Sequence, residues 1–222
     1  MENLTAIAAS KLFCGLKLDE VESLLVAANA RWRSCAQGEM ILLAGDRARD
    51  IGIVCTGEVC VVREEIMGER SLLAWLGAGE LFAEAYACAG AARLPVSVLA
   101  AQNCQVLLVD AQALLLEREP AAVCVAVREN LIRILAQKSV LLNRRLTHLS
   151  RRSTREKVLS YFTELAARQG NPFTVPSRQE MADFLCVERS AMCVVISKMR
   201  AAGEIAVDGR TITLLPRKGG AA

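Results

Sequence analysis

Residues 177–192 read SRQEMADFLCVERSAM, and this stretch predicts the first helix and turn of a helix-turn-helix. Ser177 and Glu180 have the S-x-x-E spacing of a capping box, in which each side chain bonds a backbone amide of the other residue. The box opens a short helix over residues 178–185. The apolar residues of that helix recur at the spacing of one buried face: Met181, Ala182 and Leu185.

A second helix is expected from about residue 188 to 201, after a brief turn at 186–187. Its predicted inward face consists of Ala191, Val195, Ile196 and Met199. Gly203 ends this helix, and two strand-length segments then flank the turn Asp208-Gly209, a strong hairpin signal. Two helices followed by a β-hairpin predict a winged helix-turn-helix, whose second helix enters the major groove of DNA.

The residue types at this site favour DNA recognition. Arg189 starts the second helix and is expected to bind guanine O6 and N7, while free amides at that helix end attract phosphate. Met192 is expected to contact thymine methyl groups, and Arg200 adds basic charge. The full set of predicted DNA-binding residues is Ser177, Arg178, Gln179, Arg189, Ser190, Met192, Cys193, Lys198 and Arg210.

Upstream of this domain, residues 4–30 read as helical and residues 31–110 as a series of short strands. Glycine turns, including Met67-Gly68-Glu69, separate strand-length runs rich in Val, Ile and Leu. These runs are Met40–Ala44, Ile51–Cys55, Val59–Arg63, Ser71–Leu76, Val96–Ala101 and Gln105–Val109. The pattern predicts an antiparallel, jelly-roll-like β-roll, and with the helices an α+β fold.

A long helix is expected over residues 120–149, with Pro120 in its first turn and a hinge at 150–153. Its apolar residues repeat three, four and seven apart, which favours a homodimer, with packing on the chain's own β-roll as the alternative. The predicted interface is Val127, Leu131, Ile134, Leu135, Lys138, Leu141, Leu142 and Arg145. Three domains result: an effector-sensing β-roll (1–119), the dimerisation helix (120–149) and the DNA-binding domain (150–222).

Charge is distributed unevenly along the chain. Residues 144–222 hold 14 Lys and Arg against 7 Asp and Glu, whereas residues 1–143 hold 13 against 17. A basic C-terminal domain on a weakly acidic body is typical of nucleic-acid binders. No secretory signal and no apolar run of membrane-spanning length is present, so a cytoplasmic location without membrane contact is expected.

The nine cysteines form no C-x-x-C pair, which gives zinc sites little support. Most lie in apolar segments, as expected of buried thiols in a reducing compartment. We therefore predict no metal site and no cofactor. Four cysteines of the β-roll nevertheless keep open a thiol-based redox-sensing regulator as an alternative: Cys35, Cys55, Cys60 and Cys88.

Residues 177–192 and 196–205 resemble the signature of the Crp/Fnr family of bacterial transcription regulators. The turns Gly38-Glu39, Ala44-Gly45-Asp46, Gly57-Glu58-Val59 and the segment 79–84 resemble that family's cyclic-nucleotide-binding β-roll. The resemblance implies a homodimer on a pseudo-palindromic operator in double-stranded DNA, controlled by a small-molecule effector. RNA polymerase is a candidate partner.

The chain departs from the cyclic-AMP-binding members of that family. Where they have a Gly-Glu pair after Phe, this chain has Ala83-Glu84, and Leu94-Pro95-Val96 stands where their Arg-Ser-Ala falls. Without that cation a buried phosphate is costly, so we expect an effector other than cyclic AMP, of unknown identity. The predicted effector pocket is Phe82, Glu84, Arg93, Val96, Lys138 and Leu142.

Other family features also differ. Ser190 and Val194 replace the family's Glu and second Arg, so a different operator sequence is expected. Cys14 stands alone where iron–sulfur members have a cluster, and the single histidine, His148, is expected at the surface or in the dimer seam.

Two other function classes remain to be compared with the regulator. An enzyme is disfavoured because one histidine leaves little for acid–base chemistry and no nucleophile–base–orienter grouping is visible. A cyclic-nucleotide-binding module without DNA readout is disfavoured because it would leave the winged helix unused.

Overall fold

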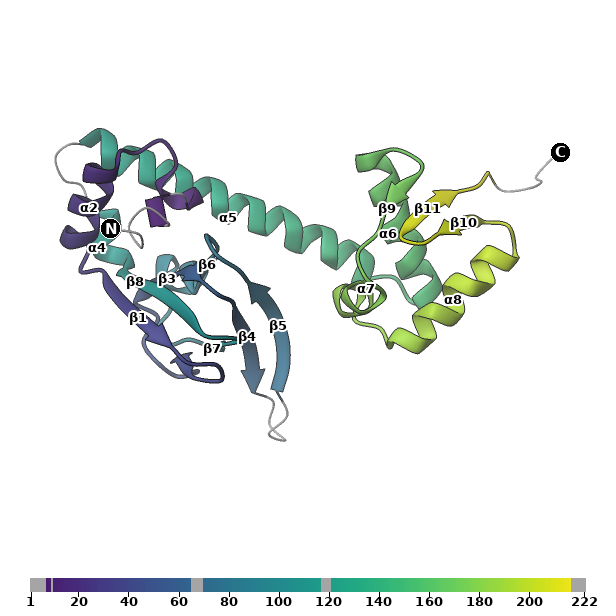
Figure 1. Ribbon diagram of the computed structural model, residues 1–222, viewed down its shortest axis with the longest axis horizontal. Coiled ribbons are helices and arrows are strands. Elements are labelled where there is room, and N and C mark those ends of the chain that lie inside the picture. Colours follow the sequence, from purple (N-terminus) through teal and green to yellow (C-terminus); the bar gives the residue numbers. More distant parts are fainter. Residues whose placement is uncertain (1–6, 9, 65–69, 117–120, 217–222) are drawn as a thin grey trace. The chain divides into compact units, whose positions relative to one another are not determined.

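The computed structural model describes residues 7–8, 10–64, 70–116 and 121–216, which form two compact units over 1–136 and 137–222 (Figure 1). The predicted turn at 67–69 and Pro120 lie outside the described residues. None of the described helices combines the length and the apolar character needed to cross a bilayer.

The N-terminal unit contains two antiparallel four-stranded sheets, in agreement with the predicted β-roll. One sheet has the order β1 (Arg31–Cys35), β8 (Cys104–Asp110), β3 (Asp50–Thr56), β6 (Leu81–Phe82). The other has the order β2 (Met40–Leu42), β7 (Ser97–Ala100), β4 (Val59–Glu64), β5 (Arg70–Leu76). Each of the six predicted runs overlaps one of these strands. The mixed helix and sheet class is confirmed.

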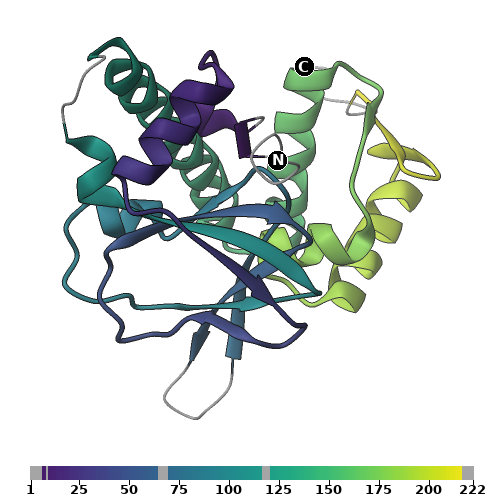
Figure 2. The same ribbon diagram turned by 60° about the vertical axis from the view of Figure 1, so that its left-hand side comes forward.

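Strands β3 and β8 are buried on both faces, which explains their continuous apolar sequences. Ile51, Ile53, Leu107 and Val109 pack against the helices of the unit. The alternate residues, such as Val54 and Val106, pack in the core between the sheets. Figure 2 shows the strands in layers with α2 (Leu18–Ala27) and the start of α5 (Ala121–Leu149) along one side. The 3-10 helix η1 (Lys11–Phe13) and the short helices α3 (Glu84–Cys88) and α4 (Ala111–Leu115) complete this unit.

The first half of α5 packs on its own unit. Val127, Leu131 and Ile134 are at most 7% exposed and lie in the same core as Leu12 and Val21. The amide of Asn130 fixes this face because its Nδ2 donates to the carbonyl oxygens of Leu12 (3.1 Å) and Cys14 (2.8 Å). Val127, Leu131 and Ile134, which were predicted for the dimer interface, are thus buried within their own unit and offer little surface to a second chain.

The C-terminal unit is a winged helix-turn-helix. Its helices are α6 (Thr154–Gln169), α7 (Arg178–Leu185) and α8 (Arg189–Ala201). Its sheet has the order β10 (Ile205–Asp208), β11 (Thr211–Leu214), β9 (Phe173–Thr174). The predicted capping box is present at the start of α7, where Ser177 Oγ accepts from the Glu180 amide (3.2 Å) and Glu180 Oε2 accepts from the Ser177 amide (2.7 Å).

His148 is buried near the C-terminal end of α5 and not at the surface, which corrects the expectation for this residue. Its Nδ1 lies 2.9 Å from Ser160 Oγ and its Nε2 lies 2.7 Å from Glu164 Oε2, both on α6. The imidazole also packs edge-on to Tyr161. These contacts, which the sequence did not predict, link the end of α5 to α6. A buried polar side chain is stable there because both ring nitrogens have partners.

Candidate nucleic-acid interface

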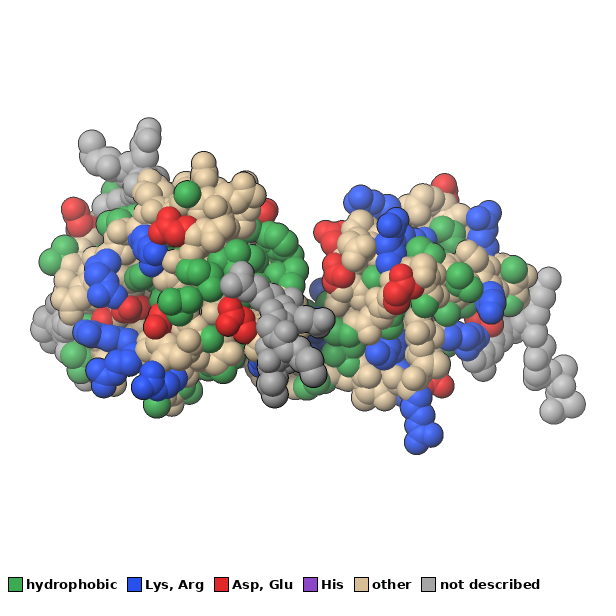
Figure 3. Space-filling model, turned by 90° about the horizontal axis from the view of Figure 1, so that it is seen from below, with side chains coloured by type: hydrophobic (Ala, Val, Ile, Leu, Met, Phe, Trp, Pro, Cys, Tyr) green, Lys and Arg blue, Asp and Glu red, His purple; other side chains and the backbone are tan. Residues whose placement is uncertain are grey.

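The starts of α7 and α8 and the turn of the β10–β11 hairpin surround one hollow of about 410 Å³. Of the nine predicted DNA-binding residues, five line it together: Ser177, Arg178, Gln179, Arg189 and Arg210. Val175, Pro176 and Gly209 complete the lining. Figure 3 shows Lys and Arg side chains distributed over the unit that carries this site, on the right of the view. Three arginines line this one hollow, and such a cluster of like charge creates a positive potential that attracts anions.

Arg189 is the first residue of α8 and is exposed. Glu188 caps the helix in front of it by accepting hydrogen bonds from the Ala191 amide (2.7 Å) and from Ser190 Oγ. Hydrogen bonds lower the pKa of Glu188 below its usual range; the bond from the Ser190 hydroxyl has the largest effect, and those from the backbone amides add to it. Not all backbone amides at this helix end are free, contrary to the expectation, because the Ala191 amide already donates to the Glu188 carboxylate. Within the described residues Arg189 forms no hydrogen bond or ion pair, so its guanidinium is free to meet a base.

Arg178 is half-buried at the start of α7, and its Nη1 is buried without a hydrogen-bond partner among the described residues. A buried N–H donor without an acceptor costs about 1–3 kcal/mol, and more when it is charged. A phosphate oxygen in the hollow would supply that acceptor. Gln179, by contrast, is held by its own helix, because its Nε2 donates to Asp183 Oδ1 (2.9 Å).

The predicted inward face of the second helix holds at Ile196, Met199 and the half-buried Val195, but Met192 takes the place of Ala191. Met192, Ile196 and Met199 are buried on α8, whereas Ala191 is exposed. Met192 is therefore part of the core and unavailable to thymine methyl groups, which corrects its assignment as a DNA contact. Cys193 is half-buried, and Lys198 and Arg200 are exposed.

Arg145 has a role that the sequence did not reveal. Its Nε donates to the carbonyl oxygen of Phe184 (3.0 Å), its Nη2 donates to that of Asp183 (3.1 Å), and its guanidinium lies 5.6 Å from the Phe184 ring centroid. A cation at the carbonyl end of α7 is favourable because it complements the helix dipole. Arg145 thus links α5 to the C-terminal end of α7 within its unit.

The residues of the predicted effector pocket are distributed over the two compact units. Phe82, Glu84 and Val96 are buried in the N-terminal unit, and Lys138 and Leu142 belong to the other unit. Arg93 is exposed and donates from Nη1 to the carbonyl oxygen of Gly45 (2.6 Å). It lines a different hollow, of about 540 Å³, together with Arg47 and Arg49, and none of those three buried residues lines that hollow.

The residue before α3 is Ala83, whose backbone adopts a conformation that is typical of glycine. Ala83 has a φ of 60°, in the left-handed region that glycine enters without penalty. Among the described residues, no three His, Cys, Asp or Glu side chains gather in a way that would hold a metal ion.

The chain is similar to one protein-family model and to several solved structures. Residues 32–116 match the cyclic nucleotide-binding domain family. No curated protein matches the chain in sequence. The structure is similar to CprK in complex with OCPA (TM-score 0.67, 14% identity, 88% of each chain). It is also similar to the c-di-GMP-responsive global regulator CLP of Xanthomonas campestris (TM-score 0.59, 18% identity, 90% of this chain and 100% of the other).

A third similar structure is the catabolite activator protein of Thermus thermophilus (TM-score 0.50, 23% identity, 93% of this chain and 94% of the other). At these identities the likeness establishes the fold. The two named by role are a regulator and an activator. Residues 32–116 therefore match a cyclic nucleotide-binding domain, and the chain has, over nearly its whole length, the fold of these three structures.

Proposed function

We propose that the protein is a cytoplasmic, sequence-specific DNA-binding transcription regulator that acts as a homodimer on a two-fold operator. One observation carries the proposal: the hollow that joins the starts of α7 and α8 to the hairpin turn collects Arg178, Arg189 and Arg210. An arginine at the start of the second helix of a winged helix-turn-helix is placed for the major groove. Arg178 and Arg210 flank it as phosphate contacts, which fix the register of the protein on the duplex.

The homodimer is supported by a second apolar stripe on α5. Ile132, Leu142 and Leu146 are exposed by 66%, 59% and 61%, which is unusual for large apolar side chains. With the half-buried Leu135 and the exposed Ser139 they repeat at intervals of 3, 4, 3 and 4 residues, the spacing of a coiled-coil seam. We propose these five residues as the dimer seam. Leu141 is also exposed but lies on the side of α5 that continues the face of Ile134 and Lys138.

Selection from randomised duplex DNA tests the function. We expect enrichment of a sequence with two-fold symmetry and half-sites centred about 34 Å apart, one turn of the double helix. Affinity for that sequence should fall steeply as salt rises, because neutralised phosphates release counterions. Enrichment of no sequence, or an affinity that is unchanged between low and high salt, would contradict the proposal.

We further propose that the effector is not cyclic AMP. The apolar side chains of Leu94 and Val96 are buried in the segment that stands in place of a phosphate-binding Arg-Ser-Ala. The neighbouring Arg93 donates a hydrogen bond to the carbonyl oxygen of Gly45. A phosphate buried among these side chains would lack a cation, which costs several kcal/mol. Titration calorimetry with cyclic AMP should therefore show no heat of binding. A micromolar site would overturn this expectation.

A further inference from the structure

Two cysteines far apart in the sequence lie directly opposite each other in the β-roll. Cys35 ends β1, Cys104 begins β8, and the two are register partners in this antiparallel pair. Opposed residues in antiparallel strands have Cα atoms about 4.5–5.5 Å apart. Disulfides require Cα separations of about 4.4–6.8 Å, so the separation expected for register partners lies within the range of a cross-strand bridge.

The backbone around the pair is held on both sides. The amide of Gln37 donates to Asn103 Oδ1 (3.0 Å), and Gln105 Nε2 donates to Ser34 Oγ (3.5 Å). Gly57 packs so closely on the start of β8 that a Cβ added to it would lie 2.7 Å from Cys104 Cβ. The two thiols are therefore kept in register, and joining them does not require the strands to separate.

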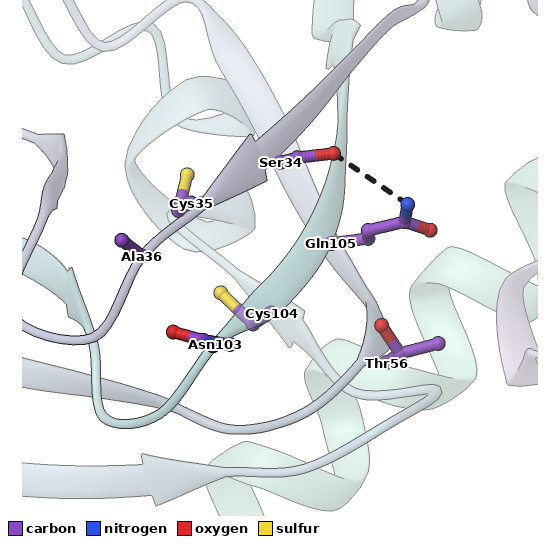
Figure 4. A pocket seen from close by; sticks show the side chains of 7 residues that line it. All are labelled: Ser34, Cys35, Ala36, Thr56, Asn103, Cys104 and Gln105. Carbon is purple, nitrogen blue, oxygen red and sulfur yellow. Dashed lines mark hydrogen bonds between the residues drawn. The ribbon is translucent and has the colours of Figure 1, made fainter.

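The thiols interact with each other and open onto a hollow. Figure 4 shows them side by side on neighbouring strands in a hollow of about 560 Å³, lined also by Ala36 and Thr56. Burial raises the pKa of both thiols. At Cys35 the charge of Arg33 opposes that increase and the charge of Glu39 adds to it, whereas at Cys104 the neighbouring Cys35 and Glu39 both add to it. The attacking thiol is therefore assigned to Cys35, which lies beside the cation.

A third thiol lies near the pair but is not equivalent to it. Burial raises the pKa of Cys55 to about 12, with the nearby Cys104 adding to the effect. At neutral pH Cys55 stays protonated, and its Sγ donates to the carbonyl oxygen of Ile53 (3.6 Å). It therefore does not compete as a nucleophile for a disulfide in this hollow.

We propose that Cys35 and Cys104 form a reversible cross-strand disulfide with a low-molecular-weight disulfide as oxidant, a modification independent of the DNA-binding function proposed above. The Cys35 thiolate attacks one sulfur of the oxidant, which forms a mixed disulfide and releases one thiolate that takes up a proton. Cys104, on losing its proton, then attacks Cys35 Sγ and expels the second thiol. The two protein thiols lose two electrons and two protons, and the oxidant is reduced to two thiols.

The test uses the full chain, equilibrated anaerobically with glutathione buffers of increasing oxidised fraction, then acidified, alkylated and mapped by mass spectrometry. We expect a cross-linked peptide pair containing Cys35 and Cys104, which disappears on addition of dithiothreitol. Cys35→Ser should abolish the cross-link. Cys60→Ser is the matched control, a buried cysteine of β4 whose register partners are not cysteines, and it should leave the cross-link unchanged.

Mapping of the unsubstituted chain decides the question even if the Cys35→Ser chain fails to fold. The proposal is overturned if Cys35 and Cys104 remain free under conditions in which the exposed Cys14 and Cys186 already carry glutathione. It is also overturned if the cross-link joins Cys104 to Cys55, or if Cys60→Ser abolishes the cross-link in a chain that still folds.

Discussion

Leu142→Glu should convert the proposed dimer into monomers and remove high-affinity binding to a two-fold operator. Leu142 occupies the middle of the exposed stripe on α5, so the substitution places two carboxylates, one per chain, inside an apolar seam. Burying each unpaired carboxylate costs several kcal/mol, and a loss of about 3 kcal/mol already weakens dimerisation by about 100-fold. Sedimentation equilibrium measures the change directly.

Leu141→Glu is the matched control for this experiment. Leu141 is the neighbouring residue, has the same side chain and is 55% exposed, but it lies outside the 3-4 repeat. We expect this variant to remain dimeric and to bind DNA with its original affinity. Because both positions are exposed in a single chain, neither substitution should lower the thermal stability of the protomer. Dissociation by Leu141→Glu with a stable Leu142→Glu dimer would show that the opposite face of α5 forms the interface.

The strands of the β-roll were largely predictable because they follow simple rules. β3 and β4 are apolar runs next to glycine turns, and β8 is a short apolar run, and such runs have few alternatives to a buried strand. β1 was missed because its sequence, Arg31-Trp32-Arg33-Ser34-Cys35, lies at a sheet edge and is mostly exposed. Its one fully buried residue is Cys35, so the strand carries little hydrophobic pattern to detect.

The faces of helices were predicted less well, for a physical reason. Apolar residues on α5 occupy two stripes, since Val127 and Ile134 meet the chain's own unit while Ile132 and Leu142 stay exposed. A helical repeat alone cannot tell which neighbour each stripe meets. On α8 both Ala191 and Met192 are apolar, and the choice of the larger side chain for the core depends on the cavity left by α6 and α7.

Contacts between distant segments were outside the reach of the sequence. The pairing of Cys35 with Cys104 depends on the register of β1 against β8, and the bonds from Arg145 to the end of α7 depend on where α5 ends. The residues that line the hollow were easier to place, because Ser177, Arg178, Gln179 and Arg189 follow from the capping box and the turn, which are local in the sequence.

Arg189→Ala should weaken operator binding by about 1–3 kcal/mol and relax the base preference at one position of each half-site. The exposed guanidinium at the start of α8 forms no hydrogen bond or ion pair within the described part of the chain, so its removal leaves the fold intact and deletes only the base contact. Repeating the DNA selection with the variant measures both effects.

Lys198→Ala is the control on the same helix. Removal of an exposed lysine that contacts phosphate should weaken binding to all sequences alike and lower the salt dependence. An unchanged operator preference in the Arg189→Ala variant would assign base recognition to other residues around the hollow, while equal losses on all sequences would make Arg189 a phosphate contact.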